Sequence, residues 1–237
     1  MVKKVIEPIN QKTFDFMSEL SSNNSKAWFD TQRERYANHI REPMKAIAQF
    51  LAEPVSALFP EFSGAPKVSR INNDLRFNPD KSPYKDYMWI SFGIRGAVAD
   101  IFAAIDKNGW TAGCGLSSPK RDEMNHWRRN LIDNHDEWTQ HFKAVNEKRK
   151  FNLHFGDKYK KPLYDDTPPD IFDLVQSKSI WIVFEPLREF SGTPEEDFMR
   201  AILQISPLYM FMVDSDVSMP NRLVGVHASI SNYIRRG

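Results

Sequence analysis

The chain has 237 residues, of which 41% are hydrophobic and 13% aromatic, a composition that supports a folded protein with a sizeable core. Its 32 Lys and Arg residues are balanced by 31 Asp and Glu residues, and the net charge of +1 argues against a dedicated nucleic-acid binder, which usually carries a basic excess. A single cysteine, Cys114, excludes an intramolecular disulfide and a multi-thiolate metal site.

The two ends of the chain carry no targeting or membrane signal. Residues 1–12 contain three lysines, and no apolar run follows the pair at Lys3 and Lys4, so they do not resemble a secretory signal. The most apolar late segment, 205–213, is far shorter than the roughly 20 residues that a spanning helix needs. We therefore expect a soluble protein with no membrane partner, and its lone cysteine favours the reducing cytoplasm.

Residues 13–60 have the apolar spacing of helices. Thr13 and Ser25 are predicted N-caps of two successive helices, because each precedes an apolar-periodic run. Pro43 suits the first turn of a third helix, and Pro54 is expected to break or kink that helix. The beginning of the chain is therefore predicted to form a helical layer.

Residues 67–115 read as an antiparallel meander of three or four strands. Apolar runs at 88–92 and 101–105 have strand character, and 110–114 is the expected returning strand. The Asn108-Gly109 pair between the last two runs is a hairpin signal, because these residues accept the positive φ angles of a tight turn.

Residues 118–210 are predicted to contain helices and one strand. Ser118 followed by proline has the form of an N-cap, and a second helix is expected from Asp136. The apolar run 179–184 is the predicted strand. Thr193 begins a capping box that opens a helix extending to Ile205.

These elements predict an α+β fold, in which a central antiparallel sheet carries an N-terminal helical layer and further helices packed on one face. We expect one domain over residues 1–237, with a C-terminal tail at 217–237.

The stretch 67–92 concentrates polar groups between two apolar strands. Six of its side chains are the predicted ligand-binding residues: Arg70, Arg76, Lys81, Ser82, Tyr84 and Lys85. Arginine pairs bidentately with carboxylate or phosphate and lysine adds a mobile charge, so this set suits an anionic small molecule. Asp74 and Asp80 are the acid–base candidates if the protein is an enzyme. The alternative is a structural network in which the two arginines pair with the two aspartates.

The same residues resemble a family. The motifs that carry the resemblance are Asn23-Asn24, Trp28-Phe29, Arg35-Tyr36, Arg41-Glu42-Pro43-Met44, Arg70-Ile71, Asp74, Arg76-Phe77 and Asp80-Lys81-Ser82-Pro83-Tyr84-Lys85. Together they are similar to a widespread bacterial family of conserved hypothetical proteins over roughly residues 13–210. The resemblance implies no activity. The chain departs from the family pattern at Asn73, where the pattern has a second arginine, and at Lys160-Lys161-Pro162, where a glycine is missing.

Other motifs are weaker. Gly113-Cys114-Gly115 before the predicted helix could present backbone N–H groups to an anion, although a plain strand-to-helix turn is the simpler interpretation. Glu123 and His126 have the spacing of half a di-iron helix pair, but no second copy occurs. We predict no metal and no cofactor.

Two functions from different classes follow. The first is a binder or enzyme that acts on an anionic, possibly phosphorylated small molecule at the Arg70–Lys85 motif. The second is a non-catalytic interaction module with a protein partner, in which the charged motif is structural. Nucleic acid ranks third because the charge balance gives no extended basic surface. The sequence carries no signal of a particular oligomeric state.

Overall fold

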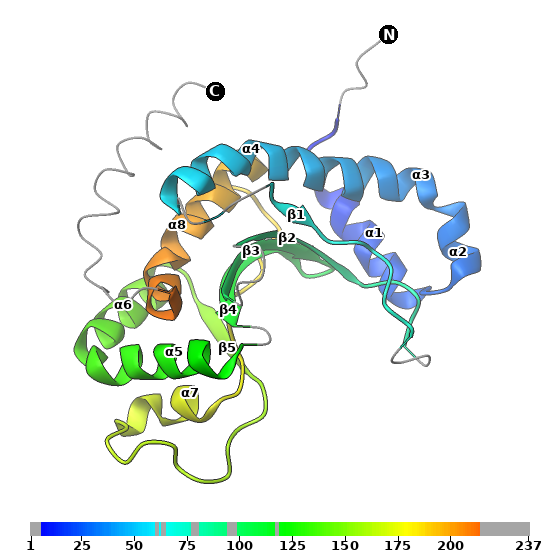
Figure 1. The fold of residues 1–237 in the computed structure, drawn as a ribbon. Coiled ribbons are helices and arrows are strands. Elements are labelled where there is room, and N and C mark those ends of the chain that lie inside the picture. Colours follow the sequence, from blue (N-terminus) through cyan, green and yellow to red (C-terminus); the bar gives the residue numbers. More distant parts are fainter. Residues whose placement is uncertain are drawn as a thin grey trace.

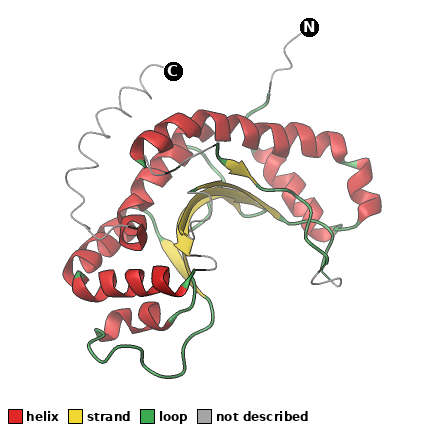
Figure 2. Ribbon diagram, in the orientation of Figure 1, coloured by secondary structure: helices red, strands yellow, loops and turns green. Residues whose placement is uncertain are grey.

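A curved antiparallel sheet forms the centre of the protein (Figure 1). The computed structural model describes residues 6–59, 62, 65–76, 81–93, 99–116 and 119–213. The six strands lie in the order β1-β2-β3-β4-β6-β5. Helices cover the convex side of the sheet, and none of the described helices covers its concave side (Figure 2). This arrangement confirms the predicted α+β architecture with helices on one face.

The N-terminal helical layer is confirmed. Its elements are α1 (Gln11–Ser22), α2 (Lys26–Thr31), α3 (Arg33–Tyr36), the π-helical turn η1 (Ala37–Arg41) and α4 (Glu42–Leu58). The predicted cap at Ser25 is also confirmed, because its hydroxyl accepts from the Trp28 amide at 3.3 Å.

Two details of this layer differ from the prediction. The N-cap of α1 is Asn10, whose side chain accepts from the Lys12 amide at 2.9 Å, while Thr13 is buried one turn later and donates its hydroxyl to the His39 carbonyl at 2.8 Å. Helix α4 also continues through Pro54, because burial of its final turn in the core offsets the one backbone hydrogen bond that proline removes.

The meander consists of β1 (Lys67–Val68), β2 (Tyr87–Phe92), β3 (Ala99–Asp106) and β4 (Gly109–Leu116), which confirms the sheet predicted over 67–115. The β3–β4 hairpin turns at the expected place. Gly109 is the one residue of this turn with a positive φ, of 142°, and a Cβ on it would collide with the Leu187 carbonyl. The Asp106 carboxylate stabilises the turn by accepting from the Asn108 amide at 2.6 Å.

The second half of the chain contributes two strands, β5 (Phe151–Phe155) and β6 (Ile180–Phe184), so the prediction of one strand was wrong. Strand β5 is an edge strand whose side chains are only partly buried or exposed, and it therefore lacks a strongly apolar signature. The Gly113-Cys114-Gly115 run is not a turn before a helix. It lies inside β4, paired on both sides with β3 and β6, so its backbone groups are used in the sheet.

The helices of this half are α5 (Arg121–Asp133), α6 (His135–Lys148), the 3-10 turn η2 (Pro169–Ile171) with α7 (Phe172–Gln176), and α8 (Pro194–Val213). Helix α5 begins at Arg121 rather than after Ser118, which lies outside the described residues; the Lys120 amide donates to the Glu123 carboxylate at 2.7 Å. Helix α8 extends past the predicted end at Ile205 through Pro207, because its last two turns are buried against the other helices.

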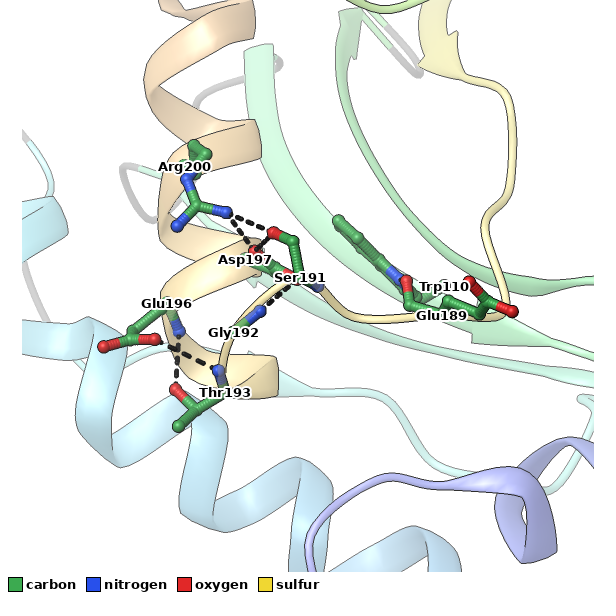
Figure 3. A network of polar contacts seen from close by, with 8 residues as sticks. All are labelled: Trp110, Glu189, Ser191, Gly192, Thr193, Glu196, Asp197 and Arg200. Carbon is green, nitrogen blue, oxygen red and sulfur yellow. Dashed lines mark hydrogen bonds and ion pairs between the residues drawn. The ribbon is translucent and has the colours of Figure 1, made fainter.

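The start of α8 confirms the predicted capping box and adds a buried carboxylate (Figure 3). The Glu196 amide donates to the Thr193 hydroxyl at 3.3 Å, and the Thr193 amide donates to the Glu196 carboxylate at 3.0 Å. Asp197, 3% exposed, accepts from the amide and hydroxyl of Ser191 at 2.5 and 2.7 Å and pairs with Arg200. These contacts fix the helix that packs across β3 and β4.

Burial alternates along the strands and gives the sheet two different faces. In β2, Met88, Ile90 and Phe92 are buried towards the helices, whereas Tyr87 and Trp89 point to the other side and remain partly exposed. The helix-facing side chains belong to one connected hydrophobic core. No helix in the described ranges is long and apolar enough to cross a membrane. The expected tail at 217–237 lies outside those ranges, and the single-domain division stays a prediction.

Candidate functional site

The predicted site lies on a two-stranded arm that extends the β1–β2 pair beyond the sheet (Figure 1). Along it the Lys85 amide donates to the Ile71 carbonyl at 2.7 Å and the Asn73 amide donates to the Pro83 carbonyl at 2.9 Å. The Asn73 side chain also donates to the Ser82 carbonyl at 2.7 Å. Asn73 thus ties the two segments together through both its backbone and its side chain.

Asn24 fixes this arm to the helical layer. Tyr84 forms a non-hydrogen-bonded pair with Asn72, so its backbone N–H and C=O point away from the partner segment. The Asn24 side chain satisfies both groups, accepting from the Tyr84 amide at 3.0 Å and donating to its carbonyl at 2.8 Å. The buried Tyr84 ring stacks on Phe29 with centroids 4.0 Å apart. The contact between Asn24 and Tyr84 was not predictable from local patterns, because 60 positions separate the two residues.

Positive side chains gather in a groove of about 930 Å³ beside the arm, which we call the cationic groove. Its charged lining residues are Lys67, Arg70, Asp74, Arg76, Lys81 and Lys85. Five cations and one carboxylate leave an excess of four positive charges. The groove also includes Trp89 of β2.

Arg76 and Asp74 form an ion pair at the outer end of the groove. The guanidinium contacts both carboxylate oxygens at 2.6 and 2.9 Å, and the Arg76 amide donates to the same carboxylate at 3.1 Å. These hydrogen bonds hold the pKa of Asp74 below its usual value. The arginine side chain is 80% exposed, so the pair contributes little to stability.

Lys85 occupies the inner end of the groove. Its ammonium donates to the Arg70 carbonyl at 2.7 Å and lies 4.8 Å from the centroid of the Trp89 ring. Partial burial lowers the pKa of Lys85, and the like charges of Arg70 and Lys81 lower it further. Arg70 and Lys81 are exposed, and neither forms an ion pair with a described residue. The positive charges here are therefore only partly compensated.

The structure brings together five of the eight predicted site residues. They are Arg70, Asp74, Arg76, Lys81 and Lys85. Two others do not line the groove: the Ser82 carbonyl is bound by Asn73, and the Tyr84 ring packs on Phe29. Asp80 lies outside the described residues. The predicted pairing of Arg76 with Asp74 is present, whereas Arg70 acts on Asp74 only at longer range.

A second hollow, of about 780 Å³, lies on the concave side of the sheet, and sequence reasoning missed it. Its lining residues, which we call the aromatic face, are Tyr87, Trp89, Ser91, Asp100, Phe102, Ala104, His154, Trp181 and Val183. They occupy alternate positions of β2, β3, β5 and β6. The alternation itself was the available signal, but β5 was not predicted and the strand order depends on tertiary pairing.

Two glycines of β4 allow the rings of this face to lie close to the sheet. A Cβ at Gly113 would come within 2.6 Å of the Phe102 ring, and a Cβ at Gly115 would collide with the Trp181 ring. Phe102 and Trp181 meet edge-on with centroids 5.4 Å apart. Aromatic rings that cover strand glycines in this way stabilise a sheet.

Asp100 is the carboxyl group among the residues that line the aromatic face. Burial raises its pKa, while a hydrogen bond from Ser91 and the charge of Lys67 lower it. Carboxyl groups with a raised pKa in a hollow are found at functional sites and also in structural positions.

The remaining sequence candidates take structural places. Cys114 is fully buried in β4, and burial raises the pKa of its thiol, as expected for an unreactive strand cysteine. Within the described ranges, no group of three or more His, Cys, Asp or Glu side chains is placed to hold a metal ion.

Comparison with known proteins places the chain in a family without an assigned activity. No curated protein and no solved structure matches it. A family model described as a conserved hypothetical protein (DUF2461) matches residues 12–211, a span that includes the arm, the cationic groove and the aromatic face. The chain therefore belongs to the DUF2461 family of conserved hypothetical proteins.

Proposed function

We propose that the protein binds a small anionic molecule, through phosphate or carboxylate groups, in the cationic groove. The observation that carries the proposal is the excess of four positive charges around one groove of about 930 Å³. Arg70 offers a planar fork for an oxyanion, and Lys81 and Lys85 add point charges. Burial lowers the pKa of Lys85 most, and repulsion from Arg70 and Lys81 lowers it further; a bound anion would relieve that repulsion.

Binding is better supported than catalysis. Asp74 stays ionised because Arg76 donates to both of its oxygens, so it is a poor proton donor at neutral pH. The alternative, an interaction module whose charged motif is structural, draws support from this pair and from the bond between Lys85 and the Arg70 carbonyl. Our proposal includes a cytoplasmic setting, where a free thiol such as that of Cys114 is ordinary.

Thermal-shift titration with inorganic phosphate and pyrophosphate tests the proposal. A ligand at 100 times its dissociation constant adds about 2.7 kcal/mol to the free energy of unfolding. For a chain of this size, each kcal/mol raises the melting temperature by about 2–4 °C. We therefore expect saturable shifts of roughly 5–10 °C, which decline as the salt concentration rises.

The matched variants are Arg70→Ala and Arg121→Ala. Both remove one exposed positive charge, but only Arg70 lines the groove. We expect Arg70→Ala to lose most of the ligand-induced shift and Arg121→Ala to keep it. The absence of any saturable shift in the wild-type protein, or an equal shift in both variants, would refute anion binding here and leave the interaction module as the better explanation.

A further inference from the structure

The cationic groove and the aromatic face form one continuous surface. Trp89 lines both hollows. Lys67 in the groove is the cross-strand neighbour of Ser91 on the aromatic face. The Lys85 ammonium lies 4.8 Å from the centroid of the Trp89 ring. An anion in the groove therefore has planar aromatic side chains within reach across β2.

Partly exposed rings border the second hollow on opposite sides. Tyr87, 43% exposed, stacks on Trp89 with centroids 5.5 Å apart and an interplanar angle of 24°. Phe102 and Trp181 lie across the sheet on β3 and β6. Exposed apolar surface of this kind, next to a charged groove, is characteristic of a binding surface.

Stabilisation of the sheet accounts for the presence of only two of these four rings. Phe102 and Trp181 cover the glycines of β4, which is sufficient reason for their presence. Tyr87 and Trp89 do not cover a glycine on β3, because their cross-strand partners there are Asp106 and Ala104. Because the side chain of Ala104 is small, the Trp89 ring borders the hollow on the side of β3.

We infer that the aromatic face receives the planar base of a nucleoside phosphate whose phosphate groups bind in the cationic groove. This inference rests on the proposed function and specifies its ligand class. The charges and the rings match the two halves of such a ligand: stacking on aromatic side chains is tolerant of base identity, and phosphates bind arginine and lysine. Strand β1, which contributes to the groove, is separated from β3, which contributes to the aromatic face, by two strand spacings, about 10 Å.

Three polar side chains line the hollow together with the rings and could bind the hydrogen-bonding atoms of a base. Ser91 and Asp100 lie on neighbouring strands in the floor of the hollow, and His154 is the cross-strand neighbour of Trp181. A few polar groups among apolar rings are typical of small-molecule sites, in which they set the orientation of the ligand.

Calorimetric titration of the wild-type protein with adenosine monophosphate, ribose phosphate and inorganic phosphate is the first test. Because base stacking contributes about tenfold or more in affinity, we expect the nucleotide to bind at least tenfold more tightly than ribose phosphate. Equal affinities for these two ligands would overturn the inference and leave the groove as an anion site. Failure of all three to bind would remove the proposed function, and the inference with it.

The Trp181→Leu variant is the second test. Leucine still covers Gly115 with apolar atoms but offers no plane for stacking. We expect the nucleotide affinity to fall about tenfold, towards that of ribose phosphate, with the phosphate affinity unchanged. The control is Phe172→Ala, which removes a 40% exposed ring that lines neither hollow. An unchanged nucleotide affinity in a folded Trp181→Leu variant would overturn the inference.

Titration with a short single-stranded oligonucleotide distinguishes a free nucleotide from a nucleic-acid strand as the natural ligand. Tighter binding of the oligonucleotide than of the mononucleotide supports the inference with a strand as the natural ligand. Tighter binding of the mononucleotide supports it with a free nucleotide.

Discussion

Substitution of Asn24 by alanine tests how the arm that carries the cationic groove is held. The Asn24 amide makes two hydrogen bonds to the Tyr84 backbone, at 2.8 and 3.0 Å, and Tyr84 is only 5% exposed. Each buried backbone group left without a partner costs about 1–3 kcal/mol. Because water can reach part of the space left by the side chain, we expect the loss to lie near the lower end, at about 2–4 kcal/mol for the two groups.

Two further variants isolate the cause. Asn24→Asp keeps an acceptor for the Tyr84 amide but removes the donor to its carbonyl, so we expect a smaller loss of about 1–2 kcal/mol. Asn23→Ala removes one exposed hydrogen bond, to the Glu19 carbonyl at 2.8 Å, and is expected to cost about 0.5–1 kcal/mol.

Urea denaturation gives the free energies of unfolding, and hydrogen exchange of the Tyr84 amide reports the local contact. We expect this amide to exchange faster in Asn24→Ala and to keep its protection in Asn23→Ala. The reasoning fails if Asn24→Ala loses no more stability than Asn23→Ala and the Tyr84 amide exchanges as in the wild-type protein.

Two further predictions concern buried charge. Burial raises the pKa of Asp100 in the folded protein, so the stabilisation from its protonated carboxyl group is complete below the ordinary value of 3.8 and is lost as the pH rises through the higher folded-state pKa. We therefore expect Asp100→Asn to melt at a higher temperature than the wild-type protein at about pH 7. In a series of thermal melts, this difference should vanish towards pH 3.8. Arg128, 2% exposed, donates to two buried backbone carbonyls at 2.8 Å each, so Arg128→Met should cost about 3 kcal/mol in urea denaturation, and a cost below about 1 kcal/mol would contradict this account.

Local signals in the sequence predicted much of the fold correctly. The Asn108-Gly109 hairpin, the Ser25 cap and the Thr193 capping box are set by contacts within a few residues, and all three are confirmed. Strands β2 and β3 were recognisable because one face of each is buried continuously. Edge strand β5 escaped prediction because its side chains are mostly half-buried or exposed, which weakens the apolar pattern.

The candidate site, like the fold, was only partly predictable from the sequence. The cations of the arm were predictable because they fall within a short run between two strands, and the structure places four of the predicted cations in one groove. The sequence could not predict that Asn24 would satisfy the backbone of Tyr84, a residue 60 positions away. Nor could it predict the whole aromatic face, because Trp181 and His154 reach it on β6 and β5, and β6 lies between β4 and β5 in the sheet although it follows both in the sequence. Strand order and long-range hydrogen bonds depend on how the whole core packs, so they follow from the three-dimensional fold and not from local sequence patterns.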